Sequence, residues 1–383
     1  MGMCERPSQD GREFPGGHIR RPLETRRENM QEQCGGFALP LDAAAKQALV
    51  DAATFGQGRL PEPRAHELGT LYLRKAASQK LSSSSVIALG AFDGLHLGHR
   101  ALIARLVADA CSRELPSAVV TFDPDPSEVV GLRPEARLLS VSDRVRGLFS
   151  LGADAVLVMH FTPELAGLAP AAFCTRIEEA LHPASVHVGT NFRFGARGAG
   201  DVSILQEILG SRGIDIVPQD LALGGTEPVS ATRIRHLLAQ GALDEAAELL
   251  GRCHYVRGIV MHGRGEGTGM GFATANVQCE PLSAMPAEGV YGGYVVVEGV
   301  PYASAINVGA PKSFEETKRP NFLEAHLLGF SGDIYGREVQ VVFCRWLRAQ
   351  RRFSSMAELE AVVRGNIEWV HVNLSADSEG AIC

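Results

Sequence analysis

Two histidines, His96 and His99, stand three residues apart in the stretch IALGAFDGLHLGHRALI, which covers residues 87–103. The stretch lies between an apolar run and a helical pattern, so its glycines fall where the chain must turn from a strand into a helix. The N-terminus of that helix offers unpaired N–H groups and the positive end of its dipole to an anion. Imidazole groups placed there can donate hydrogen bonds to phosphate oxygens and stabilise the charge that develops during phosphoryl transfer.

Two other interpretations of this histidine pair stay open from the residues alone. The pair could be half of a zinc site, although zinc needs further ligands and no His or Cys cluster stands nearby in the sequence. The stretch could also be an ordinary strand-to-helix turn that happens to contain histidine. We favour nucleotide phosphate binding.

Two further segments carry groups suited to phosphate chemistry. In VSATRIR, residues 229–235, the hydroxyls of Ser230 and Thr232 and the guanidinium of Arg233 fall at a predicted helix start. The alternative is a capped helix, with Ser230 as the N-cap residue and an exposed arginine-rich face. In LEAHLL, residues 323–328, Glu324 places a carboxylate on a predicted barrel strand, and a strand carboxylate of this kind more often faces solvent.

Residues 86–251 alternate short apolar runs with helical patterns, which is typical of parallel βαβ units. We predict a doubly wound parallel sheet with its ligand crevice at the carboxyl ends of the strands. The predicted strands cover residues 86–90, 118–122, 155–159, 185–188 and 214–217. The predicted helices cover residues 99–111, 142–151, a segment ending at 181, 203–211, 231–240 and 243–250.

After Gly251 the pattern becomes β-rich, and Gly, Pro and Asn turns separate the apolar runs. We predict a small antiparallel β-barrel followed by one helix over residues 356–371. The five predicted strands cover residues 256–261, 290–297, 302–308, 323–328 and 339–346. The candidate motifs of the two regions do not interleave, so we expect two active centres that are separable at about Gly251.

These patterns divide the chain into four parts. Residues 1–84 are interpreted as an extension or linker, partly disordered, with one helix over 41–53. Met30 could be the true start, and we expect residues 1–29 to be dispensable. The parallel-sheet domain then covers 85–251, the barrel domain 252–373, and a tail 374–383.

Bulk composition excludes several classes of protein. The 383 residues are 45% hydrophobic and 21% charged, as in an ordinary globular protein, and the net charge of −7 argues against a general binder of nucleic acid or membrane surfaces. No apolar run is long enough to span a bilayer. The eight cysteines stand singly, which indicates reduced thiols and a cytoplasmic protein.

The string GAFDGLHLGH resembles the first motif of the HxGH nucleotidyltransferases. The segments TFDPDP (121–126), VGTNFRFG (188–195) with Gly200-Asp201, and VSATRIR resemble, in order and spacing, the FAD synthetase module of prokaryotic bifunctional riboflavin kinase/FAD synthetases. The segments GFATAN (271–276), GVY (289–291), NVG (307–309) and LEAHLL resemble the riboflavin kinase module of the same family. The similarity covers residues 86–371.

The resemblance implies a role for each matching residue. In the first module, His96 and His99 would contact ATP phosphates, and Ser230, Thr232 and Arg233 would hold the triphosphate. The turn residues that would shape the nucleotide site are Gly90, Phe92, Asp93, Gly94 and Gly98, whereas Asn191, Phe192 and Asp201 would lie on the flavin side.

In the second module, Glu324 would be the base that accepts the ribityl proton. Gly271, Thr274 and Asn276 would bind the nucleotide, with Thr274 and Asn276 also on Mg²⁺. The expected substrates are riboflavin, FMN and ATP, with no nucleic-acid or membrane partner and the oligomeric state left open.

The chain departs from the family pattern at four places. Asp125 stands where a His is usual, Ala231 replaces a Ser, and Ala273 replaces a Pro. The segment GAPKSF, residues 309–314, differs from the Arg-Pro-Thr-Phe ending that is usual in the family. Three hypotheses follow: a bifunctional enzyme, an enzyme with one active module, and a flavin- or nucleotide-binding regulator without turnover. An HxGH motif and a candidate base favour an enzyme.

Overall fold

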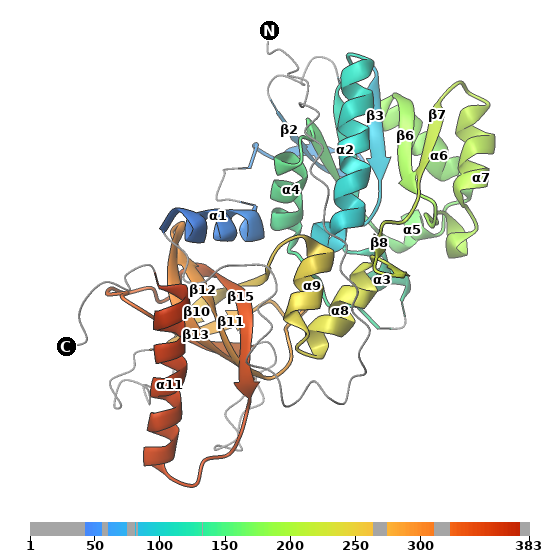
Figure 1. Cartoon of the computed structure of the whole chain (residues 1–383). Coiled ribbons are helices and arrows are strands. Elements are labelled where there is room, and N and C mark those ends of the chain that lie inside the picture. The colour runs from blue at the N-terminus through green and yellow to red at the C-terminus, as the bar shows by residue number, and fades with distance from the viewer. Residues whose placement is uncertain are drawn as a thin grey trace. The chain divides into compact units, whose positions relative to one another are not determined.

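Five parallel strands make up most of a seven-stranded sheet in the computed structural model of the chain (Figure 1). They are β3 (Ser85–Leu89), β4 (Ser117–Asp123), β5 (Ala155–His160), β6 (Pro183–Gly189) and β7 (Asp215–Gln219), and the sheet order is β1-β2-β5-β4-β3-β6-β7. Every residue of β3 is buried, as expected for a strand covered on both faces. The structure describes residues 43–55, 60–74, 81, 83–131, 133–262, 274–309 and 322–375.

Helices connect these strands, which confirms the predicted parallel-sheet domain. They are α2 (Leu97–Ser112), α3 (Pro126–Val130), α4 (Val141–Ser150), α5 (Pro163–Ala166), α6 (Pro170–Leu181) and α7 (Val202–Leu205), the last continuing as a π-helical turn over Gln206–Gly210. The chain moves from β3 through β4 to β5 on one side of the sheet, and β6 and β7 lie on the other. The carboxyl ends of β3 and β6 therefore flank the topological switch point, where ligands of such sheets bind.

The sheet also includes residues that the sequence analysis assigned to an extension. β1 (Arg64–His66) and β2 (Gly69–Leu73) add an antiparallel edge, and β2 pairs with β5 from Gly69 opposite Met159 to Leu73 opposite Ala155. Such short strands lack a clear alternating pattern, and their partner lies far along the chain. The expected helix near residues 41–53 is confirmed as α1 (Ala43–Thr54), and residues 1–42 lie outside the described part.

The predicted antiparallel barrel is confirmed as a closed one, in the order β10-β11-β14-β13-β12-β15. Its strands are β10 (His254–Met261), β11 (Ala275–Cys279), β12 (Gly289–Val297), β13 (Val300–Val308), β14 (Phe322–Leu327) and β15 (Glu338–Ala349). β11 was not predicted as a strand. At Gly293 a Cβ atom would lie 2.0 Å from the carbonyl oxygen of Val342, so only glycine fits the close contact of β12 with β15. The C-terminal helix is α11 (Met356–Leu374), slightly longer than expected.

Two helices join the sheet domain to the barrel. α8 (Ala231–Ala239) and α9 (Leu243–Leu250) contribute buried side chains to one core cluster together with the barrel strands. The N–H of Ala287, just before β12, donates to the carbonyl of Leu238. These helices therefore pack on the barrel although they precede the predicted domain boundary.

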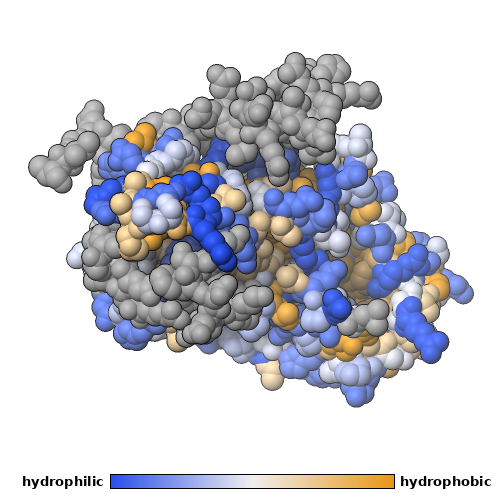
Figure 2. Space-filling model, turned by 90° about the horizontal axis from the view of Figure 1, so that it is seen from below, coloured by the Kyte–Doolittle hydropathy of each residue, from blue (hydrophilic) through white to orange (hydrophobic). Residues whose placement is uncertain are grey.

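Figure 2 shows hydrophilic residues over much of one face of the molecule, with apolar residues scattered among them. No helix in the described residues is long and apolar enough to cross a bilayer. Four cysteines, Cys174, Cys253, Cys279 and Cys344, are free thiols as expected. Cys111 departs from that expectation, because it is disulfide-bonded.

Candidate functional site

The loop after β3 bends sharply before α2 begins. Phe92 adopts a left-handed conformation with φ of 54°, and Gly94 follows with φ of 77°. A Cβ atom on Gly94 would lie 2.7 Å from Leu138 Cδ1, so both the positive φ and the close contact favour glycine. The Phe92 side chain is buried and lies against Gly90. Gly90, Phe92 and Gly94 therefore determine the conformation of the loop between β3 and α2.

His96 is the N-cap residue of α2, and its Nδ1 accepts the N–H of His99 at 3.4 Å. The two imidazole rings stack at 3.7 Å between centroids, and Phe92 meets His99 edge-on at 5.2 Å. Because Nδ1 of His96 accepts, a neutral ring carries its proton on Nε2 and can donate it to an anion. A Cβ on Gly98 would meet the His96 ring at 3.2 Å, so this glycine makes room for the stack.

Both histidines are uncharged near neutral pH. Burial lowers the pKa of His96 to about 4, although the carboxylate of Asp93 opposes the shift. Burial also lowers the pKa of His99 well below its usual value, and the nearby His96 and Arg144 add to that effect. The pair therefore offers hydrogen-bond donors rather than cations.

Asp93 anchors the loop inside the protein. Its carboxylate accepts the N–H groups of Leu138 and Leu139, each at 3.0 Å, and pairs with the guanidinium of Arg235 at 2.7 Å. The residue is only 3% exposed. Its oxygens are therefore engaged by groups of the protein itself, and the nucleotide-binding role that the resemblance implies for Asp93 stays a prediction.

The start of α8 shows why the two arginines of VSATRIR have different surroundings. Ser230 caps the helix by accepting the N–H of Arg233 at 3.2 Å, as the capped-helix alternative expected, while Thr232 is exposed. The Arg233 side chain donates to the carbonyls of Gly224 (2.9 Å) and Glu227 (3.3 Å) in the hairpin of β8 (Leu223–Gly224) and β9 (Glu227–Pro228).

Arg235, not Arg233, reaches the histidine loop, through its ion pair with Asp93. Sequence reasoning did not select Arg235. A signal for it existed, because Arg235 and Thr232 are three residues apart and share one helix face, whereas Arg233 does not face Thr232.

The candidate flavin residues follow β6, the neighbour of β3. Asn191 is exposed, and Phe192 stacks on Phe194 at 5.7 Å. Asp201 caps α7 by accepting the N–H of Ile204 at 3.1 Å, which lowers the pKa of its carboxyl, and it pairs with Arg193. Asn191 and Phe192 thus lie at the switch point, whereas the contacts recorded for Asp201 are within its own loop.

In the barrel, the strand register brings the candidate kinase residues into one row. Glu324 on β14 lies directly opposite Asn276 on β11 and opposite Asn307 on β13. All three side chains are half-buried and alternate with fully buried neighbours such as Ala325, so they face the outside of the barrel. Thr274 immediately precedes β11. Gly271 and the rest of the glycine-rich run lie outside the described residues, as do Ala273 and residues 310–314.

No group of three His, Cys, Asp or Glu side chains in the described residues is placed to hold a metal ion. The row in the barrel offers a carboxylate and two amides instead. These are the oxygen ligands that suit Mg²⁺, which binds proteins through one or two carboxylates and completes its shell with water and phosphate.

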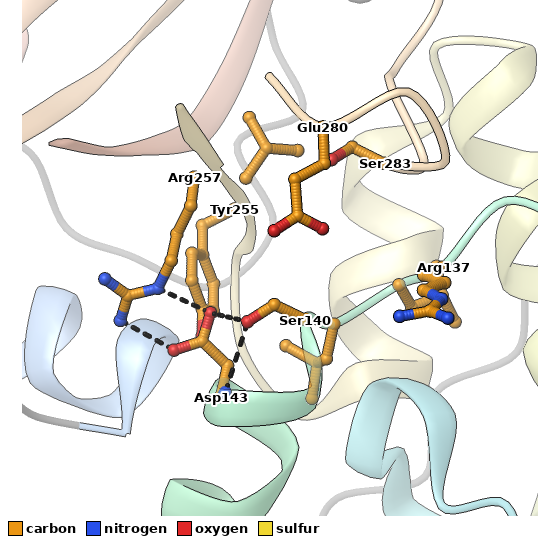
Figure 3. Close-up of a pocket in the computed structure, with 10 residues that line it drawn as sticks. Arg137, Ser140, Asp143, Tyr255, Arg257, Glu280 and Ser283 are labelled. Atoms are coloured by element: carbon orange, nitrogen blue, oxygen red, sulfur yellow. Dashed lines mark hydrogen bonds and ion pairs between the residues drawn. The ribbon is translucent and has the colours of Figure 1, made fainter. Parts of the chain in front are cut away.

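A small pocket lies where the sheet domain meets the barrel (Figure 3). Arg257 of β10 donates to both carboxylate oxygens of Asp143 in α4, at 2.7 and 2.6 Å, and Asp143 is 1% exposed. The N–H of Arg137 donates to the carbonyl of Leu282, and its own carbonyl accepts the N–H of Ala284. The sequence analysis did not anticipate this contact.

The fold and these residues define a two-module protein, with a nucleotidyltransferase-like parallel sheet followed by a closed barrel. The FAD synthetase family matches residues 78–233, and the riboflavin kinase family matches residues 250–374. The chain belongs to the family of bifunctional riboflavin kinase/FMN adenylyltransferases, which confirms the resemblance in its motifs.

Proteins of that name are similar to most of the chain. The one from Escherichia coli K12 is 35% identical over 291 residues, which is 75% of this chain and 91% of that protein. The one from Listeria monocytogenes is 31% identical and covers 73% of this chain and 88% of its own length. A crystal structure described as a macrolide-efflux protein from Streptococcus pneumoniae is 27% identical with a TM-score of 0.65, covering 76% of this chain and 94% of that one.

Proposed function

We propose that the barrel module phosphorylates riboflavin with ATP to FMN, and that the sheet module then adenylylates FMN to FAD with release of pyrophosphate. The observation that carries the proposal is the presence of both sets of chemical groups on separate modules. Stacked, neutral histidines stand at the N-terminus of α2, and a carboxylate stands in a polar row on the barrel. Small-molecule substrates and a cytoplasmic location are part of this proposal.

Adenylyl transfer needs positioning more than acid–base chemistry. A phosphate oxygen of FMN attacks the α-phosphorus of ATP, and that oxygen is already ionised at neutral pH. The protein must hold the two substrates in line and stabilise the charge on the phosphoryl oxygens. His96 and His99 would donate to these oxygens together with the N–H groups of the α2 N-terminus. Ser230, Thr232 and Arg233 would hold the triphosphate, and Asn191, Phe192 and Asp201 would lie on the flavin side.

Riboflavin phosphorylation needs a base, because a ribityl hydroxyl is a poor nucleophile. Glu324 would accept its proton while the oxygen attacks the γ-phosphorus of ATP and ADP leaves. The oxygens of Thr274 and Asn276 are of the kind that bind Mg²⁺, and the register places Asn276 beside Glu324. Mg²⁺, when bound, neutralises phosphate charge. Asn307, on the other side of Glu324, would help to orient the carboxylate.

A pair of substitutions tests the assignment of residues to reactions. Glu324→Gln keeps the shape but removes the base, so FMN formation from riboflavin should fall ~10²–10⁴-fold while FAD formation from added FMN stays nearly unchanged. His99→Ala should lower FAD formation roughly 10²–10³-fold and spare FMN formation.

The readout is the separation of riboflavin, FMN and FAD after incubation with ATP and Mg²⁺. Equal slowing of both steps by Glu324→Gln, or intact FAD synthesis in His99→Ala, would contradict the assignment. Wild-type protein that forms only one product would identify an enzyme with one active module, and no product at all would favour a binding protein.

A further inference from the structure

A fully buried arginine, Arg144 of α4, lies beneath the histidine loop. The two hydrogens of its Nη1 are shared among three acceptors: the carbonyl of Ala91 in that loop at 2.9 Å, the carbonyl of Phe122 at 3.0 Å and the hydroxyl of Thr121 at 3.0 Å. The Thr121 hydroxyl in turn donates to the same Ala91 carbonyl at 2.7 Å. Arg144 therefore joins the end of β4 to the loop that carries His96 and His99.

The charge of Arg144 has no acidic partner among the described residues. Its Nε and Nη2 are buried and make no hydrogen bond there. The adjacent carboxylate, Asp143, is engaged by Arg257 and Arg146, and Asp93 is engaged by Arg235. An uncompensated buried cation is costly, so its charge is expected to interact with a negative group that is brought to this site.

We propose that Arg144 is a positioning residue of the adenylyl-transfer site: it fixes the Ala91 carbonyl and supplies a buried positive charge that favours the anionic triphosphate above the loop. The inference rests on the proposed function. Arg144 is fully buried and would act through the loop and through its field rather than by touching substrate.

Burial is the main reason that the pKa of His99 lies well below its usual value, and the charge of Arg144 adds to this shift. The groups that face this imidazole are the stacked ring of His96, the ring of Phe92 and the guanidinium of Arg144, while Asp93 acts on His96 from the loop and is itself paired with Arg235. His96 and Arg144 both disfavour a proton on His99. Removing the charge of Arg144 should therefore raise the pKa of His99 and move the acid limb of the adenylylation rate to higher pH.

The test compares Arg144→Gln and Arg144→Met with the charge-retaining Arg144→Lys. FAD formation from FMN is measured against ATP concentration and pH, and FMN formation from riboflavin serves as the internal control. We expect the neutral variants to lose about 10- to 100-fold in kcat/KM for ATP, less than a direct donor supplies, and to show the shifted acid limb. Arg144→Lys retains the positive charge but not the planar guanidinium, so it should stay within about fivefold of wild type and keep the acid limb.

Arg146→Gln is the matched control, because Arg146 lies on the same helix, is partly exposed and pairs with Asp143 at 3.1 Å. It should leave both reactions unchanged. Neutral Arg144 variants with unchanged kcat/KM for ATP, or losses in Arg144→Lys as large as in the neutral variants, would overturn the inference. If neither neutral variant folds, Arg144→Lys decides alone, and a loss beyond fivefold overturns it. Wild-type protein that makes no FAD would instead contradict the proposed function.

Discussion

At the scale of residues, the histidine loop couples protonation to stability. The pKa of His96 is about 4 in the folded chain, whereas an unfolded histidine titrates near 6.5. Between these values the unfolded state binds a proton that the folded state does not. Stability therefore falls as pH drops from about 6.5 to 4, by about 3 kcal/mol for complete passage through this range.

The first prediction uses this difference. His96→Asn keeps a side-chain acceptor for the α2 cap but removes the titrating group, so its unfolding free energy should fall less than that of wild type between pH 6.5 and 5. The expected difference is about 2 kcal/mol, measured by urea unfolding. His160→Asn changes an exposed histidine and should follow wild type. Parallel pH profiles for wild type and His96→Asn would contradict the burial argument.

The second prediction concerns Asp93. Asp93→Asn places an amide where two backbone N–H groups and Arg235 need an acceptor. Breaking a buried pair in this way should lower the unfolding free energy by about 3–5 kcal/mol and weaken FAD formation through the displaced loop. Thermal unfolding and product separation are the measurements. A variant that loses FAD formation with unchanged stability would indicate that Asp93 contacts substrate, as the resemblance implied.

The amino-acid sequence alone could locate the histidine pair and the Ser230 cap, because local spacing and capping preferences determine both. It could not separate Arg233 from Arg235, since the choice depends on which face of α8 meets the loop around Asp93. Arg144 is the strongest case. The residues around Arg144 in the sequence predict an ordinary amphipathic helix. Only the packing of α4 under the loop shows that the charge of Arg144 is buried.

At the scale of elements, continuous apolar runs predicted the parallel strands, because these strands are buried on both faces. β-rich runs between Gly, Pro and Asn turns predicted all barrel strands except β11. The missed elements have short or mixed sequences. β11 follows a glycine-rich run, and its residue Asn276 was interpreted only as a ligand, although the alternating burial places Asn276 outward and Ala275 and Val277 inward. The edge strands β1 and β2 were not predicted, because these short strands show no clear alternation of apolar and polar residues.

The third prediction tests the edge. A chain that begins at residue 84 lacks β2, so the apolar strand β5 becomes an exposed sheet edge. Exposed apolar edges pair with other chains. This chain should aggregate and unfold at a lower temperature than one that begins at residue 60, and both lack α1. Light scattering and thermal unfolding make the comparison. Equal behaviour of the two truncations would support the original boundary near residue 84.

At the scale of the whole molecule, the motifs divide cleanly between two regions but the packing does not. α8 carries candidate phosphate residues of the sheet module, yet Ile234 and Leu238 on its other face belong to the core cluster of the barrel side. Arg257 of the barrel also forms an ion pair with Asp143 of the sheet domain. From the sequence, the boundary is predicted where the pattern of apolar residues changes. In the structure, the apolar faces of α8 and α9 pack against the barrel on the other side of that boundary.

The last prediction follows from this packing and concerns the cut at Gly251. A fragment of residues 253–383 loses α8 and α9, which bury Ile234, Leu238, Leu249 and Leu250. Each fully buried side chain of this kind contributes about 1.5–3 kcal/mol, so four approach the total stability of an ordinary domain, roughly 5–15 kcal/mol. We therefore expect residues 253–383 to be unfolded or barely stable.

A fragment of residues 229–383 keeps both helices and should fold and make FMN but no FAD. Both fragments lack Asp143 and keep Glu338, so the ion pairs of Arg257 change equally in each, and the comparison isolates the two helices. Urea unfolding and riboflavin phosphorylation are measured on the pair. If residues 253–383 prove as stable and as active as residues 229–383, the burial of α8 and α9 contributes little, and the change of pattern at Gly251 marks the true boundary of the kinase.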